Sequence, residues 1–209
     1  MLRALTRLLS SAGLEARGFP SPAAFLDAHD PATPGCLVLD VALPGLDGLE
    51  VQKALSVSDC ARPIVFITGR GDIPTTVRAM RGGAVDFLTK PVNDRDLLAA
   101  VRNAIEIDRV ARLAQVEMDA MRQRLASLTP REREVLVHVV AGRLNKQIAA
   151  DLGTVEKTIK VHRARIMEKM AVRSLADLVR VAERLGVSLT TAKPTTTSWR
   201  GAVTGRPPT

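Results

Sequence analysis

Short apolar runs alternate with helical patterns along the first half of the chain. Residues 36–40, 63–68 and 84–89 are apolar over most of their length, and after each run apolar residues recur at every third or fourth position. Strands in a parallel sheet have this continuous apolar character, because helices cover both faces of the sheet. The pattern therefore predicts an α/β fold built on a parallel sheet. It also predicts a helix at residues 2–13 and a short strand at residues 14–19.

The second half of the chain shows helical patterns alone. A capping box, formed by Thr129, Pro130 and Glu132, opens the first of these helices. A short helix at residues 145–153 and a longer basic helix at residues 155–170 follow. A short helix, a glycine break and a longer basic helix are typical of a helix-turn-helix. We therefore expect an all-α domain here.

The two patterns divide the chain into parts. We expect an α/β domain at residues 1–106, a helical linker at residues 107–123 and the all-α domain at residues 124–189. The remainder, residues 190–209, is rich in Thr, Pro and Gly and is predicted to be disordered. A short dimeric coiled coil in the linker stays open as an alternative, although Asp108 and Gln115 interrupt its heptads.

Charge separates the two halves further. The chain has a net charge of +8, yet residues 1–105 hold equal numbers of basic and acidic side chains, so the whole excess lies in residues 106–209. A neutral half joined to a basic half predicts that the basic half meets a polyanion.

Two classes of protein are disfavoured by composition. No apolar run is long enough for a membrane span, which takes about 20 residues. The cysteines, Cys36 and Cys60, lack the close spacing of a zinc site and read as thiols in a reducing cytoplasm.

Polar side chains end the three apolar runs of the first half. Asp40, Thr68 and Lys90 stand at the carboxyl ends of the predicted strands, where an open parallel sheet forms its working crevice. A carboxylate, a hydroxyl and an ammonium suit phosphoryl transfer to Asp40, with the other two groups holding the phosphoryl oxygens. Each signal alone is ordinary turn chemistry, but together they favour a site.

Three segments resemble a two-component response regulator: "LVLDVALPGLDGLEVQ", "PIVFITGRGDIPTTVRAMRGGAVDFLTKP" and the "LTPRERE…NKQIAADLG…TIKVHRARIMEKM" region. The resemblance is to the FixJ-type branch, in which a flavodoxin-like receiver domain precedes a LuxR-type helix-turn-helix. It implies that Asp40 accepts phosphate from a histidine kinase and that Thr68 is the switch hydroxyl. It implies that Lys90 is the cationic partner, and that Phe87 is the aromatic residue that follows Thr68 inward.

The family also implies Mg²⁺, held by Asp40, the backbone of Ala42 and an acidic pair at the end of a central first strand. The sequence shows neither that strand nor the pair, and Asp47, Glu50 and Asp72 read as loop and helix-start residues. Two interpretations stay open: an N-terminally truncated receiver, or a degenerate one that works without phosphorylation and serves for dimerisation. An aspartyl-phosphate hydrolase of the dehalogenase class is disfavoured, because its second carboxylate would stand at Ala42.

The basic helix presents a face suited to the major groove. The residues expected to contact DNA are Lys146, Lys157, Thr158, Lys160, Val161, Arg163, Ala164, Arg165 and Lys169. Val155, Ile159, Ile166 and Met170 are expected to pack inward, and His162 to be a packed histidine.

These observations predict a cytoplasmic, DNA-binding transcriptional response regulator rather than an enzyme. The expected partners are promoter DNA, a histidine kinase and a second copy of the chain, with RNA polymerase as a further one; no membrane is involved.

Overall fold

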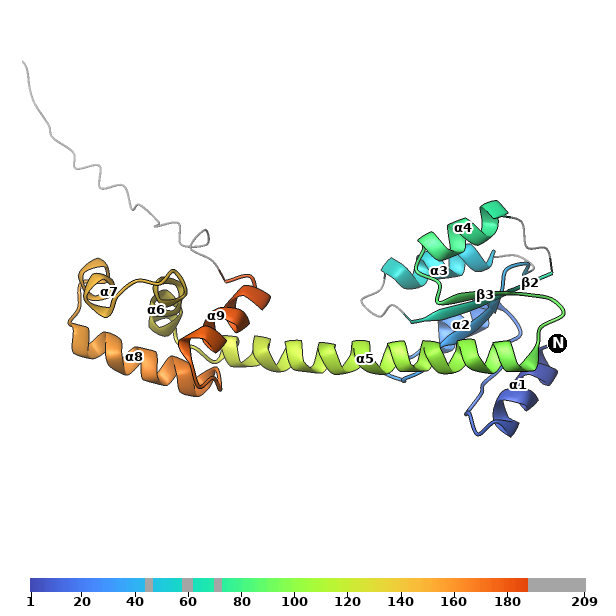
Figure 1. The fold of residues 1–209 in the computed structure, drawn as a ribbon, viewed down its shortest axis with the longest axis horizontal. Coiled ribbons are helices and arrows are strands. Elements are labelled where there is room, and N and C mark those ends of the chain that lie inside the picture. The colour runs from blue at the N-terminus through green and yellow to red at the C-terminus, as the bar shows by residue number, and fades with distance from the viewer. Residues whose placement is uncertain (44–46, 58–61, 70–72, 188–209) are drawn as a thin grey trace, which may run out of the picture. The chain divides into compact units, whose positions relative to one another are not determined.

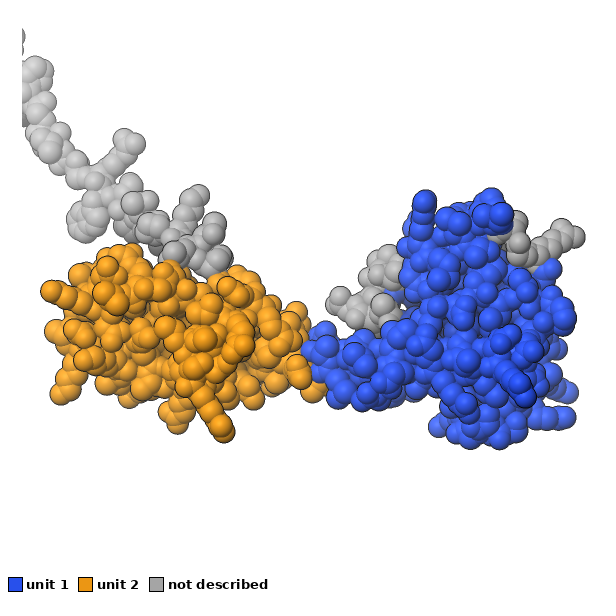
Figure 2. Space-filling view, viewed as in Figure 1, with its two compact units in different colours: residues 1–115 blue, residues 116–209 orange. Residues whose placement is uncertain are grey.

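A computed structural model describes residues 1–43, 47–57, 62–69 and 73–187. Asp72, Cys60 and the predicted disordered tail, residues 190–209, lie outside these ranges. The chain forms two compact units, Met1–Gln115 and Val116–Thr209, which Figure 2 shows in different colours.

The first unit is built on a parallel sheet, as its apolar runs predict. Strands β1 (Leu37–Asp40), β2 (Ile64–Thr68) and β3 (Asp86–Thr89) lie in the order β1-β2-β3 among the described residues. In the register, Asp40 lies opposite Ile67. All three strands run in one direction, so their carboxyl ends share one edge of the sheet.

Helices cover both faces of this sheet (Figure 1). Among the described residues, these helices are α1 (Leu2–Ser11), α2 (Pro22–Ala28), α3 (Gly48–Val57), α4 (Ile73–Arg81) and α5 (Asp94–Ala126). Side chains of α2, α3 and α4 pack with Leu39 and Phe66 on one face. Side chains of α1 and α5 pack with Ile67 on the other face. Alternate residues of each strand therefore enter opposite cores, which explains the continuous apolar runs.

The predicted strand at residues 14–19 is wrong. This segment has no regular secondary structure, and in the described part of the chain β1 pairs with β2 alone. An extended segment becomes a strand only when a neighbour supplies hydrogen bonds. Leu14 and Phe19 instead pack against the helical layers on either face of the sheet.

The second unit is helical, as predicted. It contains the end of α5, followed by α6 (Pro130–Val140), α7 (Asn145–Asp151), α8 (Glu156–Lys169) and α9 (Leu175–Arg184). The capping box is confirmed: the Thr129 hydroxyl accepts from the backbone N–H of Glu132, and the Glu132 carboxylate accepts from that of Thr129. Gly153 separates α7 from α8 at a φ of +60°, a conformation that favours glycine.

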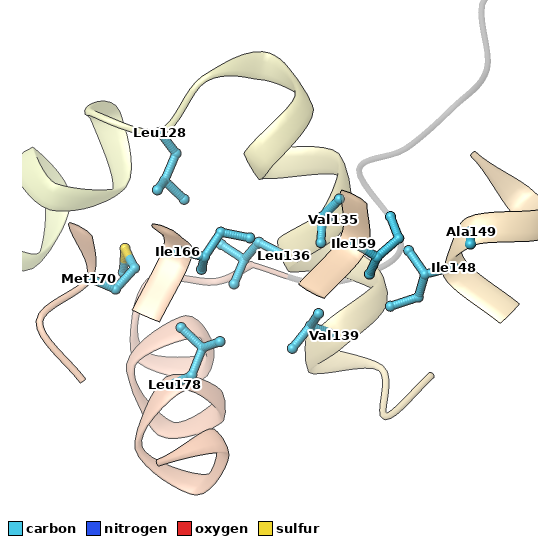
Figure 3. Close-up of a cluster of buried hydrophobic side chains, with 10 residues drawn as sticks. All are labelled: Leu128, Val135, Leu136, Val139, Ile148, Ala149, Ile159, Ile166, Met170 and Leu178. Carbon is cyan, nitrogen blue, oxygen red and sulfur yellow. The ribbon is translucent and has the colours of Figure 1, made fainter. Parts of the chain in front are cut away.

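One apolar core holds the second unit together (Figure 3). Its buried side chains are Leu128, Val135, Leu136, Val139, Ile148, Ala149, Ile159, Ile166, Met170 and Leu178. Because all of them except Leu128 and Met170 come from α6, α7, α8 and α9, this core fixes the inward side of α8 and leaves its other side to solvent. Among the described helices, none is long and apolar enough to cross a bilayer.

Candidate functional site

The first candidate site lies at the carboxyl edge of the sheet. Asp40 ends β1, Thr68 ends β2, and Lys90 directly follows β3. The backbone N–H of Lys90 donates to the carbonyl of Thr68 at 2.7 Å, which fixes the chain where it leaves the sheet. The structure thus brings the three strand ends to one edge.

Asp40 is held on both carboxylate oxygens. Its Oδ2 lies 2.5 Å from Nζ of Lys90, and its Oδ1 accepts the backbone N–H of Ala42 at 3.1 Å. The Asp40 side chain is 14% exposed, so one side of the carboxylate still meets solvent. A positioned, partly accessible carboxylate beside an ammonium is suited to attack on an electrophilic phosphorus whose charge the ammonium then neutralises.

Thr68 and Phe87 stand behind this edge. Thr68 is buried, and Phe87 packs in the core that α2, α3 and α4 share. The Phe87 ring lies 6.2 Å from the ring of Phe66, its register partner on β2. Phe66 and Phe87 therefore both face the layer formed by α2, α3 and α4, on the side of the sheet away from α5.

Asp47 and Glu50, the acids that follow Asp40 in the described sequence, make hydrogen bonds at the start of α3. The backbone N–H of Asp47 donates to Oε2 of Glu50 at 3.0 Å, and Oδ1 of Asp47 accepts from the backbone N–H of Leu49. Within the described ranges, no three His, Cys, Asp or Glu side chains lie close enough to hold a metal ion. Mg²⁺ prefers an octahedron of oxygens, usually including carboxylates. Asp40, already paired with an ammonium, does not by itself fit that requirement.

The second candidate site is the outer side of α8. Lys157, Lys160, Val161, Ala164 and Arg165 are exposed there, and Thr158 is half-buried. Ile159, Ile166 and Met170 are buried, as predicted. Val155 is not: it precedes the first turn of α8 as its N-cap residue and remains exposed, which corrects the expectation that it packs inward. His162 is half-buried, and its Nδ1 has no hydrogen-bond partner among the described atoms.

Two basic side chains of α8 have partners within the second unit. Nη1 of Arg163 donates to Oδ1 of Asn145, the first residue of α7, at 3.1 Å. Nζ of Lys169 lies 2.7 Å from Oε2 of Glu132 and donates to the carbonyl of Ser127. Lys146, on α7, is exposed.

Glu132 is a residue whose second role sequence reasoning missed. Its carboxylate is 3% exposed and joins the start of α6 to the end of α8 through Lys169. The ammonium of Lys169, with the backbone N–H of Thr129, lowers the pKa of Glu132 from 4.5 to about 2. The capping box was visible in the sequence, but a partner 37 residues away had no sequence signal.

Two known families match the two units. Residues 1–102 match the response regulator receiver domain, and residues 126–182 match the luxR family of bacterial regulatory proteins.

Curated proteins and solved structures match nearly the whole described chain. Nodulation protein W of Bradyrhizobium diazoefficiens is 50% identical over 188 residues, which cover 90% of this chain and 83% of that protein. The transcriptional regulatory protein FixJ of the same organism is 43% identical, with 90% of this chain and 91% of that protein covered. The low-resolution structure of the response regulator StyR superposes with a TM-score of 0.79 at 45% identity, covering 88% of this chain and 93% of that one.

Proposed function

Because the chain belongs to the FixJ-type response regulators, in which a receiver domain precedes a LuxR-type DNA-binding domain, we propose that Asp40 is its phosphoryl acceptor. The chain is a transcriptional regulator of a two-component system, and its family is one of transcription regulators rather than enzymes. The observation that carries the proposal is the contact of Oδ2 of Asp40 with Nζ of Lys90 at 2.5 Å. It places a cation where a phosphoryl group on Asp40 would carry its charge.

In the proposed transfer, a carboxylate oxygen of Asp40 attacks the phosphorus of a phosphohistidine. The new O–P bond forms as the P–N bond breaks, and the electron pair of that bond leaves with the imidazole of the kinase. Lys90 neutralises the charge on the phosphoryl oxygens, and the N–H of Ala42 holds the carboxylate in place. Receiver domains typically use Mg²⁺, but among the described residues no three His, Cys, Asp or Glu side chains are grouped to hold a metal ion, so we propose that this chain lacks the family's acidic pair.

Asp40→Asn is expected to abolish phosphate incorporation from acetyl phosphate, because the amide is not a nucleophile for this transfer. Intact-protein mass and phosphate-retarding gels measure the incorporation. Asp47→Asn is the matched control, since it changes the same chemical group in an exposed acid. If the wild-type chain incorporates phosphate and the Asp40→Asn variant incorporates as much, the assignment is contradicted.

The alternative function is regulation without phosphorylation, in which the receiver serves for dimerisation. The observation that favours it is the absence of a metal-holding acidic cluster among the described residues. A wild-type chain that binds promoter DNA but is never labelled, with or without Mg²⁺, would establish this alternative. In both cases we propose that the chain works in the cytoplasm, as a homodimer on promoter DNA that also meets RNA polymerase.

For DNA, we propose that α8 enters the major groove. The exposed face of Lys157, Lys160, Val161 and Ala164 supports this, with Lys160 and Val161 reading base edges. We assign contacts with the phosphates to Lys146, Thr158, Arg163 and Arg165. Lys169 is engaged with Glu132, so we now propose a structural role for it instead.

Lys160→Ala is expected to lower the affinity for the preferred site about tenfold or more and to relax the preference for one base pair. Lys146→Ala should instead weaken all duplexes about equally, because a phosphate contact carries no sequence information. Titrations against a preferred and a scrambled duplex at one salt concentration measure both. Equal losses on the two duplexes for Lys160→Ala would place that lysine at the backbone.

A further inference from the structure

An acidic side chain stands at the start of the DNA-facing helix. Glu156 is the first residue of α8, and its Oε1 lies 3.3 Å from Nζ of Lys160. The two side chains are 48% and 65% exposed, so the pair projects into solvent. This inference rests on the proposed placement of α8 in the major groove.

The position of Glu156 is unfavourable for binding to DNA irrespective of its sequence. The N-terminal residues of a recognition helix approach the base edges most closely. A carboxylate there repels the phosphates that the surrounding lysines attract. The helix dipole favours an acid in the first turn and so accounts for the presence of Glu156. That interaction does not require the carboxylate of Glu156 to pair with Lys160.

The spacing of the pair matches the edge of one base pair. In the major groove a guanine presents O6 and N7 as acceptors, and its cytosine presents the N4 amino group as a donor. O6 and N4 lie about 2.9 Å apart, because a Watson–Crick hydrogen bond joins them. The ammonium and the carboxylate lie 3.3 Å apart, in the complementary order of donor and acceptor. We propose that Lys160 and Glu156 together read a single G·C pair, with Lys160 on guanine and Glu156 on cytosine N4.

The proposed contacts of Lys160 and Glu156 predict an order of preference among the four base pairs at that position. C·G presents the donor and acceptor in the reverse order, so both the ammonium and the carboxylate meet the wrong group. A·T places the thymine O4 acceptor beside the carboxylate and keeps only the N7 acceptor of adenine for the ammonium. T·A keeps the order but replaces the N7 acceptor beside Lys160 with a methyl group. The expected preference is therefore G·C first, T·A second, A·T third and C·G last.

The test is selection of binding sites by the full chain from a random duplex pool, followed by titration of single-base variants of the preferred site. The wild type should favour G·C over A·T and C·G about tenfold or more at the position that Lys160→Ala relaxes. Glu156→Gln should reduce this ratio to below about threefold at the same position, because an amide offers a donor as well as an acceptor. The preference at the other positions should not change.

Glu168→Gln is the matched control, since it removes the same charge from an exposed position near the other end of α8. It should raise the affinity for every duplex slightly and leave the base preference unchanged. A Glu156→Gln variant that behaves in the same way, or that relaxes a different base pair from Lys160→Ala, overturns the inference. Failure of the wild type to bind duplex DNA, or a Lys160→Ala variant that keeps every preference, would instead overturn the proposed function of α8.

Discussion

Lys169→Met is expected to destabilise the second unit by about 3 kcal/mol, because it leaves the Glu132 carboxylate buried without its cation. That carboxylate is 3% exposed, and the Lys169 ammonium lies 2.7 Å from it. Amide hydrogen exchange in α6 and α8, followed by mass spectrometry, reads the stability of this unit separately from the first. Lys157→Met, at an exposed position on the same helix, should change it by less than about 0.5 kcal/mol.

The same substitution separates a structural lysine from one that contacts DNA. A lysine that neutralises a phosphate contributes about 0.9 to the slope of log affinity against log salt concentration. Because Lys169 is already paired with Glu132, we expect Lys169→Met to leave that slope unchanged under conditions where the domain stays folded. A slope reduced by about one unit would return Lys169 to the phosphate contacts.

The Glu132 interaction also carries a defined pH dependence. The folded unit lowers the pKa of Glu132 from 4.5 to about 2, so the stabilisation is complete above pH 4.5 and is lost as the pH falls toward 2. Glu132→Gln lacks the ion pair at every pH. The difference in stability between the wild type and this variant should therefore shrink as the pH is lowered through that range.

The predicted elements depend on local signals, which explains where the predictions held. The apolar runs that became β1, β2 and β3 and the capping box of α6 are properties of adjacent residues. The direction of parallel strands then placed Asp40, Thr68 and Lys90 at one edge without knowledge of any distance. The strand expected at residues 14–19 failed because a strand also needs a neighbour, which a local pattern does not reveal.

Side-chain partners that are distant in the sequence could not be predicted. The sequence predicts that Lys169 contacts DNA, because it shows the charge of this residue but not its contact with Glu132. Val155 fitted the apolar spacing of α8 but precedes the helix, so the periodicity did not apply to it. Asp108 read as an interruption of a linker pattern. In the structure it is a buried acid that accepts the backbone N–H of Gly35 at 2.8 Å.

Asp108 anchors α5 to the loop that leads into β1. Its Oδ2 also lies 2.7 Å from Nε of Arg112, and the guanidinium of Arg112 donates to the carbonyls of Pro31, Ala32 and Thr33. Helix α5 runs through both units, and β1 ends at Asp40. This cluster therefore ties the segment before the proposed phosphorylation site to α5.

Asp108→Ala is expected to destabilise the first unit by about 3 kcal/mol, since it leaves the half-buried N–H of Gly35 unpaired and Arg112 without its buried acid. Glu106→Ala is a demanding control, because the Glu106–Arg109 pair on the same helix has the same N–O separation of 2.7 Å. Its side chains are about 60% exposed, whereas Asp108 is 6% exposed, so its loss should cost under about 0.5 kcal/mol. Hydrogen exchange in β1 and the middle of α5 measures both variants. Equal effects would mean that distance, and not burial, sets the strength of these pairs, and the anchoring role of Asp108 would fail with it.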